Sequence, residues 1–206
     1  SEASINGYPV EEFPEFDLPE SDIKFTLPAE VLKEAIRQVI FAVAADENRP
    51  IFTGVLLEIR ENQMQLVATD THRLAWRSVS LDNCENVDIK IIIPGKTLNE
   101  LTKIIVGQEK KIGITVTENQ ILFSTDETSM ISRLIDGNFP NYRQVIPKDH
   151  VSRVVAKTKD LGEATERASL LTKEGSSIVR LSLNNNILVI SVNTEAGRVR
   201  EELPVY

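Results

Sequence analysis

Apolar positions recur at two different periods along the chain, and the change of period separates predicted helices from predicted strands. Apolar residues three and four positions apart predict one helix over residues 28–45 and a second over residues 96–107. Alternating or continuous apolar runs bounded by turn residues predict the strands. These strands are Gly54–Ile59, Gln63–Ala68, Leu74–Leu81, Ile89–Ile93, 112–116, Gln120–Ser124 and 129–135.

The predicted elements repeat. Glu61-Asn62-Gln63 recurs as Glu118-Asn119-Gln120, and each copy follows a predicted helix and strand and runs on into a Thr-Asp pair. Residues 161–192 contain a third unit, with a helix followed by two strands and a turn of three asparagines between them. One helix with one hairpin cannot bury its own apolar face, whereas two such units can pair their sheet edges with the helices on one side. We therefore predict an α+β fold of repeated helix-plus-hairpin units.

Counting these units predicts the domain organisation. Residues 1–21 are rich in Pro, Glu and Asp and are predicted to be a tail or linker. Residues 22–145 hold two units and are predicted to be a complete module, whereas residues 146–206 hold one unit, which is half a module. We expect a chain with half a module to be a fragment of a longer protein, and its exposed strand edges to invite pairing with another copy.

Charge is concentrated at one end of the chain. The net charge is −8, yet residues 1–22 hold seven acidic residues and no Lys or Arg, so the remainder is nearly neutral. A nearly neutral body is compatible with a basic face. Hydrophobic residues make up 41 %, and no apolar run approaches the roughly 18 residues of a membrane span. A lone cysteine, Cys84, excludes an intrachain disulfide and favours a cytoplasmic, reducing setting.

Signals for catalysis are weak. The sequence contains no P-loop, no glycine-rich phosphate cradle and no paired-carboxylate metal cluster. Asp70 and His72 with Ser78 or Ser80 could be taken for a hydrolase triad, but nothing resembles an oxyanion turn or a nucleophile elbow. With only two histidines and no Cys–His spacing, we expect no metal and no cofactor. A binding scaffold is favoured over two alternatives, a nucleotide-processing enzyme and a β-rich structural or adhesion repeat protein.

Two long motifs carry a family resemblance. They are Val67-Ala68-Thr69-Asp70-Thr71-His72-Arg73-Leu74-Ala75 and Leu134-Ile135-Asp136-Gly137-Asn138-Phe139-Pro140-Asn141-Tyr142-Arg143-Gln144-Val145-Ile146-Pro147. Both resemble signatures of the second module of bacterial DNA sliding clamps, the β subunits of the replicative polymerase. Residues 49–56 resemble the family's pre-strand segment, and residues 8–14 resemble the acidic link that closes its first module.

The resemblance implies a non-catalytic processivity factor with the DNA-clamp fold. Family members are dimers of three-module subunits, which form a ring with sheets outside and helices around duplex DNA. The family tethers polymerase subunits, the clamp loader and repair proteins through short peptides that carry a glutamine and apolar residues. Without most of module one and half of module three, this chain is not expected to close such a ring.

The family's peptide pocket carries over to nine positions. They are Phe52, Thr69, Thr71, His72, Arg73, Leu74, Pro140, Gln144 and Val145. Two of these depart from the family pattern, because Thr71 stands where a glycine is common and Gln144 where an arginine is common. Taken without the resemblance, Phe52 fits the core as well as it fits a pocket wall, and residues 69–74 fit an ordinary turn.

Basic residues on the polar sides of the three helices are candidates for contacts with DNA phosphates, which require point charges and no base reading. They are Lys33, Arg37, Lys96, Lys103, Lys159 and Arg167. Glutamates share the same helix faces, so a solvated charged face remains an equal alternative; they are Glu30, Glu34, Glu100 and Glu163. Trp76 and Cys84 are expected to be structural.

Overall fold

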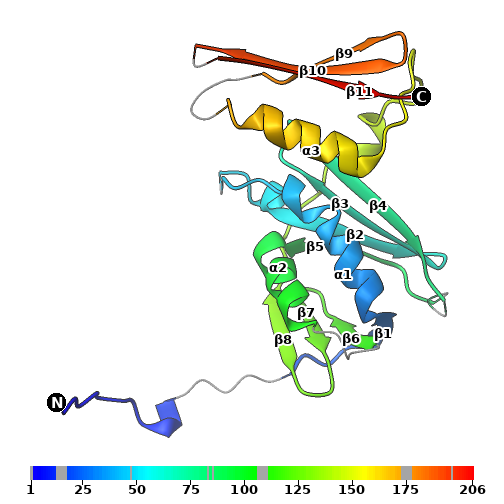
Figure 1. The fold of residues 1–206 in the computed structure, drawn as a ribbon. Helices are drawn as coiled ribbons and strands as arrows, with labels where there is room; N and C mark the ends of the chain where they lie inside the picture. Colours follow the sequence, from blue (N-terminus) through cyan, green and yellow to red (C-terminus); the bar gives the residue numbers. More distant parts are fainter. Residues whose placement is uncertain are drawn as a thin grey trace. The chain divides into compact units, whose positions relative to one another are not determined.

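Two copies of one succession of elements follow each other in the first part of the chain: a strand, a helix and an antiparallel meander of three strands (Figure 1). The structure, a computed structural model, describes residues 2–12, 18–46, 48–82, 84, 86–105, 111–172, 178–195 and 197–206. The first copy comprises β1 (Ile23–Pro28), α1 (Ala29–Arg37), β2 (Gly54–Arg60), β3 (Gln63–Thr69) and β4 (Leu74–Ser80). The second comprises β5 (Ile89–Pro94), α2 (Gly95–Ile104), β6 (Lys111–Val116), β7 (Gln120–Ser124) and β8 (Ser129–Arg133).

The two copies exchange their first strands. β1 pairs antiparallel with β6, which gives a sheet of order β1-β6-β7-β8. In the same way β5 pairs antiparallel with β2, which gives a sheet of order β4-β3-β2-β5. Each meander is therefore completed by a strand of the other copy. α1 and α2 contact each other, as the predicted packing of two units requires.

A proline ends each exchanged strand and sets where the helix begins. Pro28 and Pro94 occupy the position before the first helical residue, with φ of −61° and −53° and extended ψ. Proline fixes φ near this value and offers no N–H, so it fits a place where the strand stops and the helix starts. The helices consequently begin directly after the prolines, at Ala29 and Gly95.

The predicted helix over residues 28–45 is wrong in its second half. α1 ends at Arg37, and a short 3₁₀ helix, η2 (Ile40–Ala42), follows it. Three β-branched residues, which favour helices weakly, follow within the predicted span after Arg37; they are Val39, Ile40 and Val43. Val39 is fully buried there. The apolar spacing continues beyond Arg37 because these residues enter the core, although the helix has ended.

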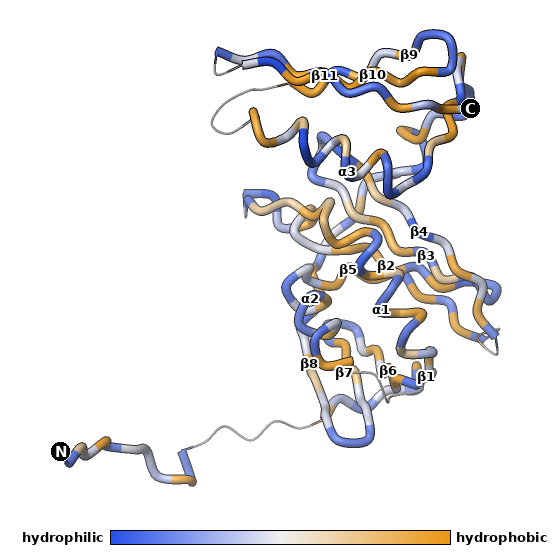
Figure 2. Tube along the Cα trace, in the orientation of Figure 1, coloured by the Kyte–Doolittle hydropathy of each residue, from blue (hydrophilic) through white to orange (hydrophobic). Residues whose placement is uncertain are grey.

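One core joins both copies. It contains Leu32 and Ile36 of α1, Leu98 and Leu101 of α2, and the inward residues of both sheets. These helix positions are 2 % exposed or less, which confirms the apolar sides predicted from their spacing. In Figure 2, hydrophobic positions colour parts of α1 and of the strands orange. The core is the physical reason that neither copy is independent of the other.

The predicted turn at Glu61-Asn62 has the expected backbone, and the predicted turn of three asparagines is reduced to two because Asn184 ends β9. Glu61 and Asn62, between β2 and β3, have φ of 51° and 60°. Asn185 and Asn186 repeat this geometry in the later hairpin, with φ of 45° and 63°. Left-handed pairs of this kind match the twist of the flanking strands, which is why asparagine is favoured in them.

After β8 the chain returns across the outer face of the β4-β3-β2-β5 sheet. We call residues 134–145 the outer strap. The Ile135 N–H donates to the Ile92 carbonyl at 2.9 Å, which attaches the strap to the edge of β5. Further along, Phe139 and Tyr142 are 7 % and 5 % exposed. The strap therefore builds a second apolar layer on the sheet face that the helices do not cover.

Residues 146–206 form a compact unit of their own. It contains α3 (Thr158–Ser169) and a sheet of order β11-β10-β9, with β9 (Arg180–Asn184), β10 (Ile187–Thr194) and β11 (Gly197–Pro204). Ala164 and Ala168 of α3 pack with apolar residues of β10, as their spacing predicted. Leu181 and Leu183 of β9 stay 58 % and 47 % exposed, so the helix leaves that edge of the sheet uncovered.

β11 was not predicted. It alternates half-buried and exposed positions, but its inward residues include polar ones, so no apolar alternation marks it in the sequence. Hydrogen bonds to β10 along its whole length hold it in place.

Among the described residues, none of the helices has the length and apolar character needed to cross a membrane.

Candidate peptide-binding site

A cavity of about 400 Å³ lies where the β3–β4 loop meets the outer strap. Three separate segments line it: the end of the 3₁₀ helix η3 (Pro50–Thr53), the β3–β4 loop and the strap. Its lining residues are Phe52, Thr69, Thr71, His72, Arg73, Leu74, Phe139, Pro140, Asn141, Tyr142 and Val145. The cavity belongs wholly to residues 1–145.

Eight of the nine predicted pocket residues line this cavity. Gln144 does not; it is exposed on the short 3₁₀ helix η4 (Tyr142–Gln144). Phe139, Asn141 and Tyr142 line the cavity without having been predicted. They flank Pro140 in the same motif, so their position in the sequence was the available signal.

Asp70 organises the β3–β4 loop. Its Oδ1 accepts hydrogen bonds from the backbone N–H groups of His72 and Arg73, both at 3.0 Å, and its Oδ2 accepts one from Arg73 Nε at 2.9 Å. These bonds, led by those from the two backbone amides, hold the pKa of the Asp70 carboxyl below its usual value. Asp70 therefore acts as a loop cap and not as the acid of a triad.

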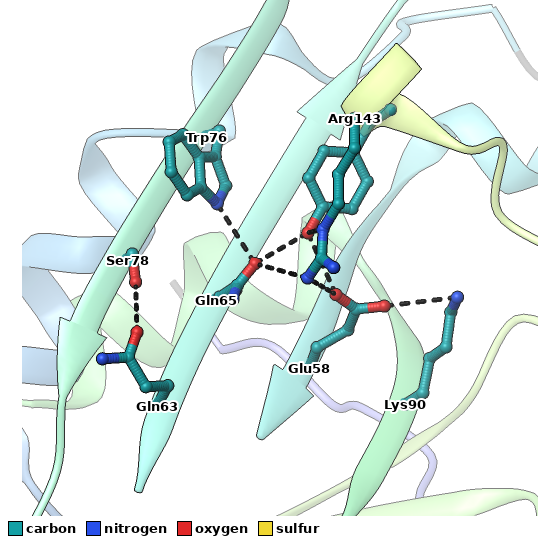
Figure 3. A network of polar contacts seen from close by, with 8 residues as sticks. Glu58, Gln63, Gln65, Trp76, Ser78, Lys90 and Arg143 are labelled. Carbon is teal, nitrogen blue, oxygen red and sulfur yellow. Dashed lines mark hydrogen bonds and ion pairs between the residues drawn. The ribbon is translucent and has the colours of Figure 1, made fainter. Parts of the chain in front are cut away.

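Of the remaining triad candidates, Ser78 has another partner. Ser78 Oγ donates to Gln63 Oε1 at 3.1 Å on the outer face of the sheet (Figure 3). No hydrogen bond joins His72 to a serine among the described residues, and these residues contain no group of three His, Cys, Asp or Glu that could hold a metal ion.

The walls of the cavity are largely apolar, and its one arginine is paired with Asp70. Phe52, Leu74 and Val145 contribute apolar walls together with the strap residues Phe139 and Pro140. None of the lining residues is acidic, and Arg73 supplies a guanidinium whose side chain is 57 % exposed. An apolar cleft with a few polar groups is the usual form of a ligand site. Phe52 is a wall residue here, which decides the choice between core and pocket that the sequence left open.

A polar network anchors the strap beneath the cavity. The Tyr142 hydroxyl lies 2.7 Å from Gln65 Oε1 and 3.0 Å from Glu58 Oε2. One hydroxyl has one proton, so these two acceptors share it, while the oxygen accepts from Arg143 Nε at 3.3 Å. Burial, reinforced by Glu58, raises the pKa of Tyr142 and keeps the phenol neutral. Lys90 Nζ, 3.2 Å from Glu58, completes the network.

Trp76 and Cys84 differ in their surroundings. Burial raises the pKa of the Cys84 thiol, which is 2 % exposed, so a reactive thiolate is disfavoured. Trp76 lies on the outer face and is 51 % exposed, with its indole N–H donating to Gln65 at 3.4 Å. Cys84 thus has the buried environment of a structural residue, whereas Trp76 borders the polar network.

The basic residues predicted to face DNA on α1 and α2 are engaged to different degrees. Lys33 Nζ donates to the backbone carbonyl of Ile105 at 2.5 Å, and its side chain is only 14 % exposed, so it joins the two helices. Lys103 Nζ lies 2.7 Å from Glu100 on the same helix. Three of the four candidates on these helices are exposed; they are Arg37, Lys96 and Lys103.

The two candidates on α3 both have acidic neighbours. Lys159 Nζ lies 3.8 Å from Glu163, one turn further along the helix. Arg167 forms two parallel hydrogen bonds of 2.8 and 2.9 Å to Glu201 of β11. These bonds lower the pKa of Glu201. Arg167 therefore ties helix to sheet in this unit.

The fold is that of DNA clamps. The beta subunit of the DNA polymerase of Streptococcus pyogenes is similar at a TM-score of 0.90 and 29 % identity, covering 96 % of this chain and 54 % of that one. The DnaN sliding clamp of Pseudomonas aeruginosa, solved bound to griselimycin, is similar at 0.87 and 30 % identity, with 96 % and 54 % covered. These likenesses confirm the predicted α+β clamp fold.

The family follows from the sequence matches. The central domain of the DNA polymerase III beta subunit matches residues 26–141, and the C-terminal domain of that subunit matches residues 143–206. The beta sliding clamp of Bacillus subtilis is 37 % identical over 206 residues, 98 % of this chain and 54 % of that protein. The chain belongs to the DNA polymerase III beta-subunit family, as its two motifs indicated, and spans about half the length of these relatives.

Proposed function

We propose that this chain is part of a sliding clamp of bacterial DNA replication and that its cavity binds a short peptide of partner proteins. The observation that supports the proposal is the pairing of apolar walls with a loop fixed by Asp70, which together offer anchoring pockets without acidic groups. The partners are polymerase subunits, the clamp loader and repair proteins, and the role is non-catalytic.

The domain assignment follows from the same proposal. Residues 1–21 are the end of the first clamp module, residues 22–145 the complete middle module and residues 146–206 the first half of the third. In the whole protein, two subunits form a ring around duplex DNA in the cytoplasm. Weak phosphate contacts by the helix cations suffice there, because encirclement supplies the hold. Arg37 and Lys96 are exposed members of that set.

Calorimetry with a synthetic peptide that carries a glutamine followed by apolar residues tests the site. A short peptide buries little area, so an affinity near micromolar is expected, about −8 kcal/mol. Leu74→Asp or Val145→Asp places an unpaired charge in the cleft that the peptide closes. Each change is expected to weaken binding at least about tenfold, or 1.4 kcal/mol.

Val10→Asp is the matched control, since Val10 is 80 % exposed in the N-terminal segment and lies outside the cavity. It should bind like the parent. Thermal unfolding should be nearly unchanged in all three variants because the cleft opens to solvent. Equal peptide affinities for the parent and both cavity variants would mean that the peptide binds elsewhere.

A further inference from the structure

Two threonines of the β3–β4 loop line the cavity, and their hydroxyls differ in what they contact. Thr69 Oγ1 donates to the Arg73 carbonyl at 2.8 Å and accepts from the Thr71 N–H at 3.2 Å. Its hydroxyl is therefore used inside the loop. The Thr71 hydroxyl, by contrast, has no hydrogen-bond partner within the described part of the chain, although the residue is exposed and lines the cavity.

Thr71 also has an unfavourable backbone conformation. Its φ is +79°, in the left-handed region that β-branched residues rarely adopt. The bonds to Asp70 and Thr69 on either side hold the loop in this shape. Glycine would adopt the same shape without strain. The threonine side chain therefore costs stability, and strain of this kind tends to persist at binding sites.

We infer that Thr71 is a specificity-determining residue whose hydroxyl forms a hydrogen bond with an amide group of the bound peptide. This inference rests on the proposed function. The hydroxyl can both donate and accept, so it fits a main-chain amide or a side-chain carboxamide. Thr69, with its hydroxyl already used, fixes the loop and leaves this contact to Thr71.

Three substitutions at one position separate the contributions. Thr71→Val keeps the shape and the strain but removes the hydroxyl, Thr71→Ser keeps the hydroxyl but removes the methyl, and Thr71→Gly removes the side chain and the strain. Peptide affinity by calorimetry should fall about three- to tenfold for Val and Gly and stay within about twofold of the parent for Ser, since one neutral hydrogen bond is at stake. Thermal unfolding should be unchanged for Val and shifted upward for Gly.

Thr69→Val is the matched control for the loop. It removes a hydroxyl that the loop uses, so it should lower the unfolding temperature, whereas Thr71→Val should not. A double-mutant cycle with a peptide in which alanine replaces the glutamine identifies the contacted group. If the losses of affinity from Thr71→Val and from the alanine peptide are coupled, the hydroxyl contacts the glutamine carboxamide. If the two losses are additive and Thr71→Val still binds both peptides more weakly than the parent, the hydroxyl contacts the peptide main chain.

The outcomes distinguish failure of this inference from failure of the proposed function. Parent-like affinity of Thr71→Val and Thr71→Gly overturns this inference alone and leaves the peptide site in place. Weak binding by Thr71→Ser with normal binding by Thr71→Val also overturns it, because the methyl would then be the contact. No binding by the parent overturns the proposed function and this inference together.

Discussion

Replacing Tyr142 with phenylalanine removes one buried hydroxyl and keeps the ring that anchors the outer strap. The hydroxyl lies between Gln65 and Glu58 on the sheet face, at 2.7 and 3.0 Å. The change therefore removes the tyrosine's hydrogen bonds to the polar network and leaves the apolar contacts of the strap, while Arg143 still donates to Gln65 at 3.3 Å. Because the same strap forms one wall of the cavity, both stability and peptide affinity report on the change.

The contacts that remain set the magnitude. A hydrogen bond to a charged group contributes about 1.5–3 kcal/mol, with the high end reached when a buried partner is left unsatisfied. Here Glu58 keeps Lys90 at 3.2 Å, and Gln65 keeps the indole of Trp76 at 3.4 Å. We therefore expect Tyr142→Phe to lower the free energy of unfolding by about 1–2 kcal/mol. A loss of 1 kcal/mol corresponds to roughly 2–4 °C in melting temperature for a domain of this size.

Urea unfolding followed by circular dichroism measures this loss, with Tyr8→Phe as the control because Tyr8 is 90 % exposed. The folded-state pKa of Tyr142 is raised, so its neutral hydroxyl stabilises the fold below the ordinary tyrosine pKa of 10.0, and this stabilisation is lost as the pH rises toward the raised value. The difference between parent and Tyr142→Phe should shrink there. Tyr142→Phe as stable as the parent at neutral pH would refute the anchoring role of the network.

Two further changes probe the loop and the strap. Asp70→Asn should lower the free energy of unfolding most near neutral pH, where the Asp70 carboxylate is charged. The difference from the parent should shrink as the pH falls below the ordinary pKa of 3.8 and through the lowered folded-state pKa. Urea titrations at several pH values measure this difference, and a difference that stays constant in acid would contradict the prediction. Gly54→Ala should cost about 1–3 kcal/mol, because its Cβ would lie 2.5 Å from an Ile92 methyl and 2.7 Å from an Ile135 methyl. Gly162→Ala in α3, with no atom within 4 Å, should instead raise stability, and thermal melts of both variants decide between these signs.

The sequence was informative where local patterning decides structure. Helix faces, hairpin turns and most strands follow from apolar period and turn residues, which act over a few positions. The exchange of β1 and β5 was beyond its reach: β1 (Ile23–Pro28) was not predicted as a strand at all, and the periodicity of β5 equally fits a strand that pairs within its own copy. The end of α1 at Arg37 was missed for a related reason, since burial preserved the helical spacing after the helix had stopped.

The candidate site likewise has parts that local sequence predicts and parts that only the folded structure reveals. Two contiguous motifs supplied nearly all of the cavity lining through their resemblance to a family, and the three missed residues flank Pro140 in one of them. The contacts that hold the site are different in kind. Tyr142 meets Glu58, far away in the sequence, and Lys33 caps the end of another helix at Ile105. No local pattern marks such pairs, because only the folded sheet and the helix packing bring their partners together.

The exchange of first strands also makes the two copies inseparable. Ile23 pairs with Val116, and Gly54 pairs with Pro94, so each sheet contains strands from both copies. A cut in the connection between β4 and β5 would break the chain without breaking either sheet, and the pieces would remain interlocked as a noncovalent pair. Either piece alone would hold an unfinished meander and a helix with a bare apolar side. Folding must then await pairings between distant parts of the chain, which makes it cooperative and comparatively slow.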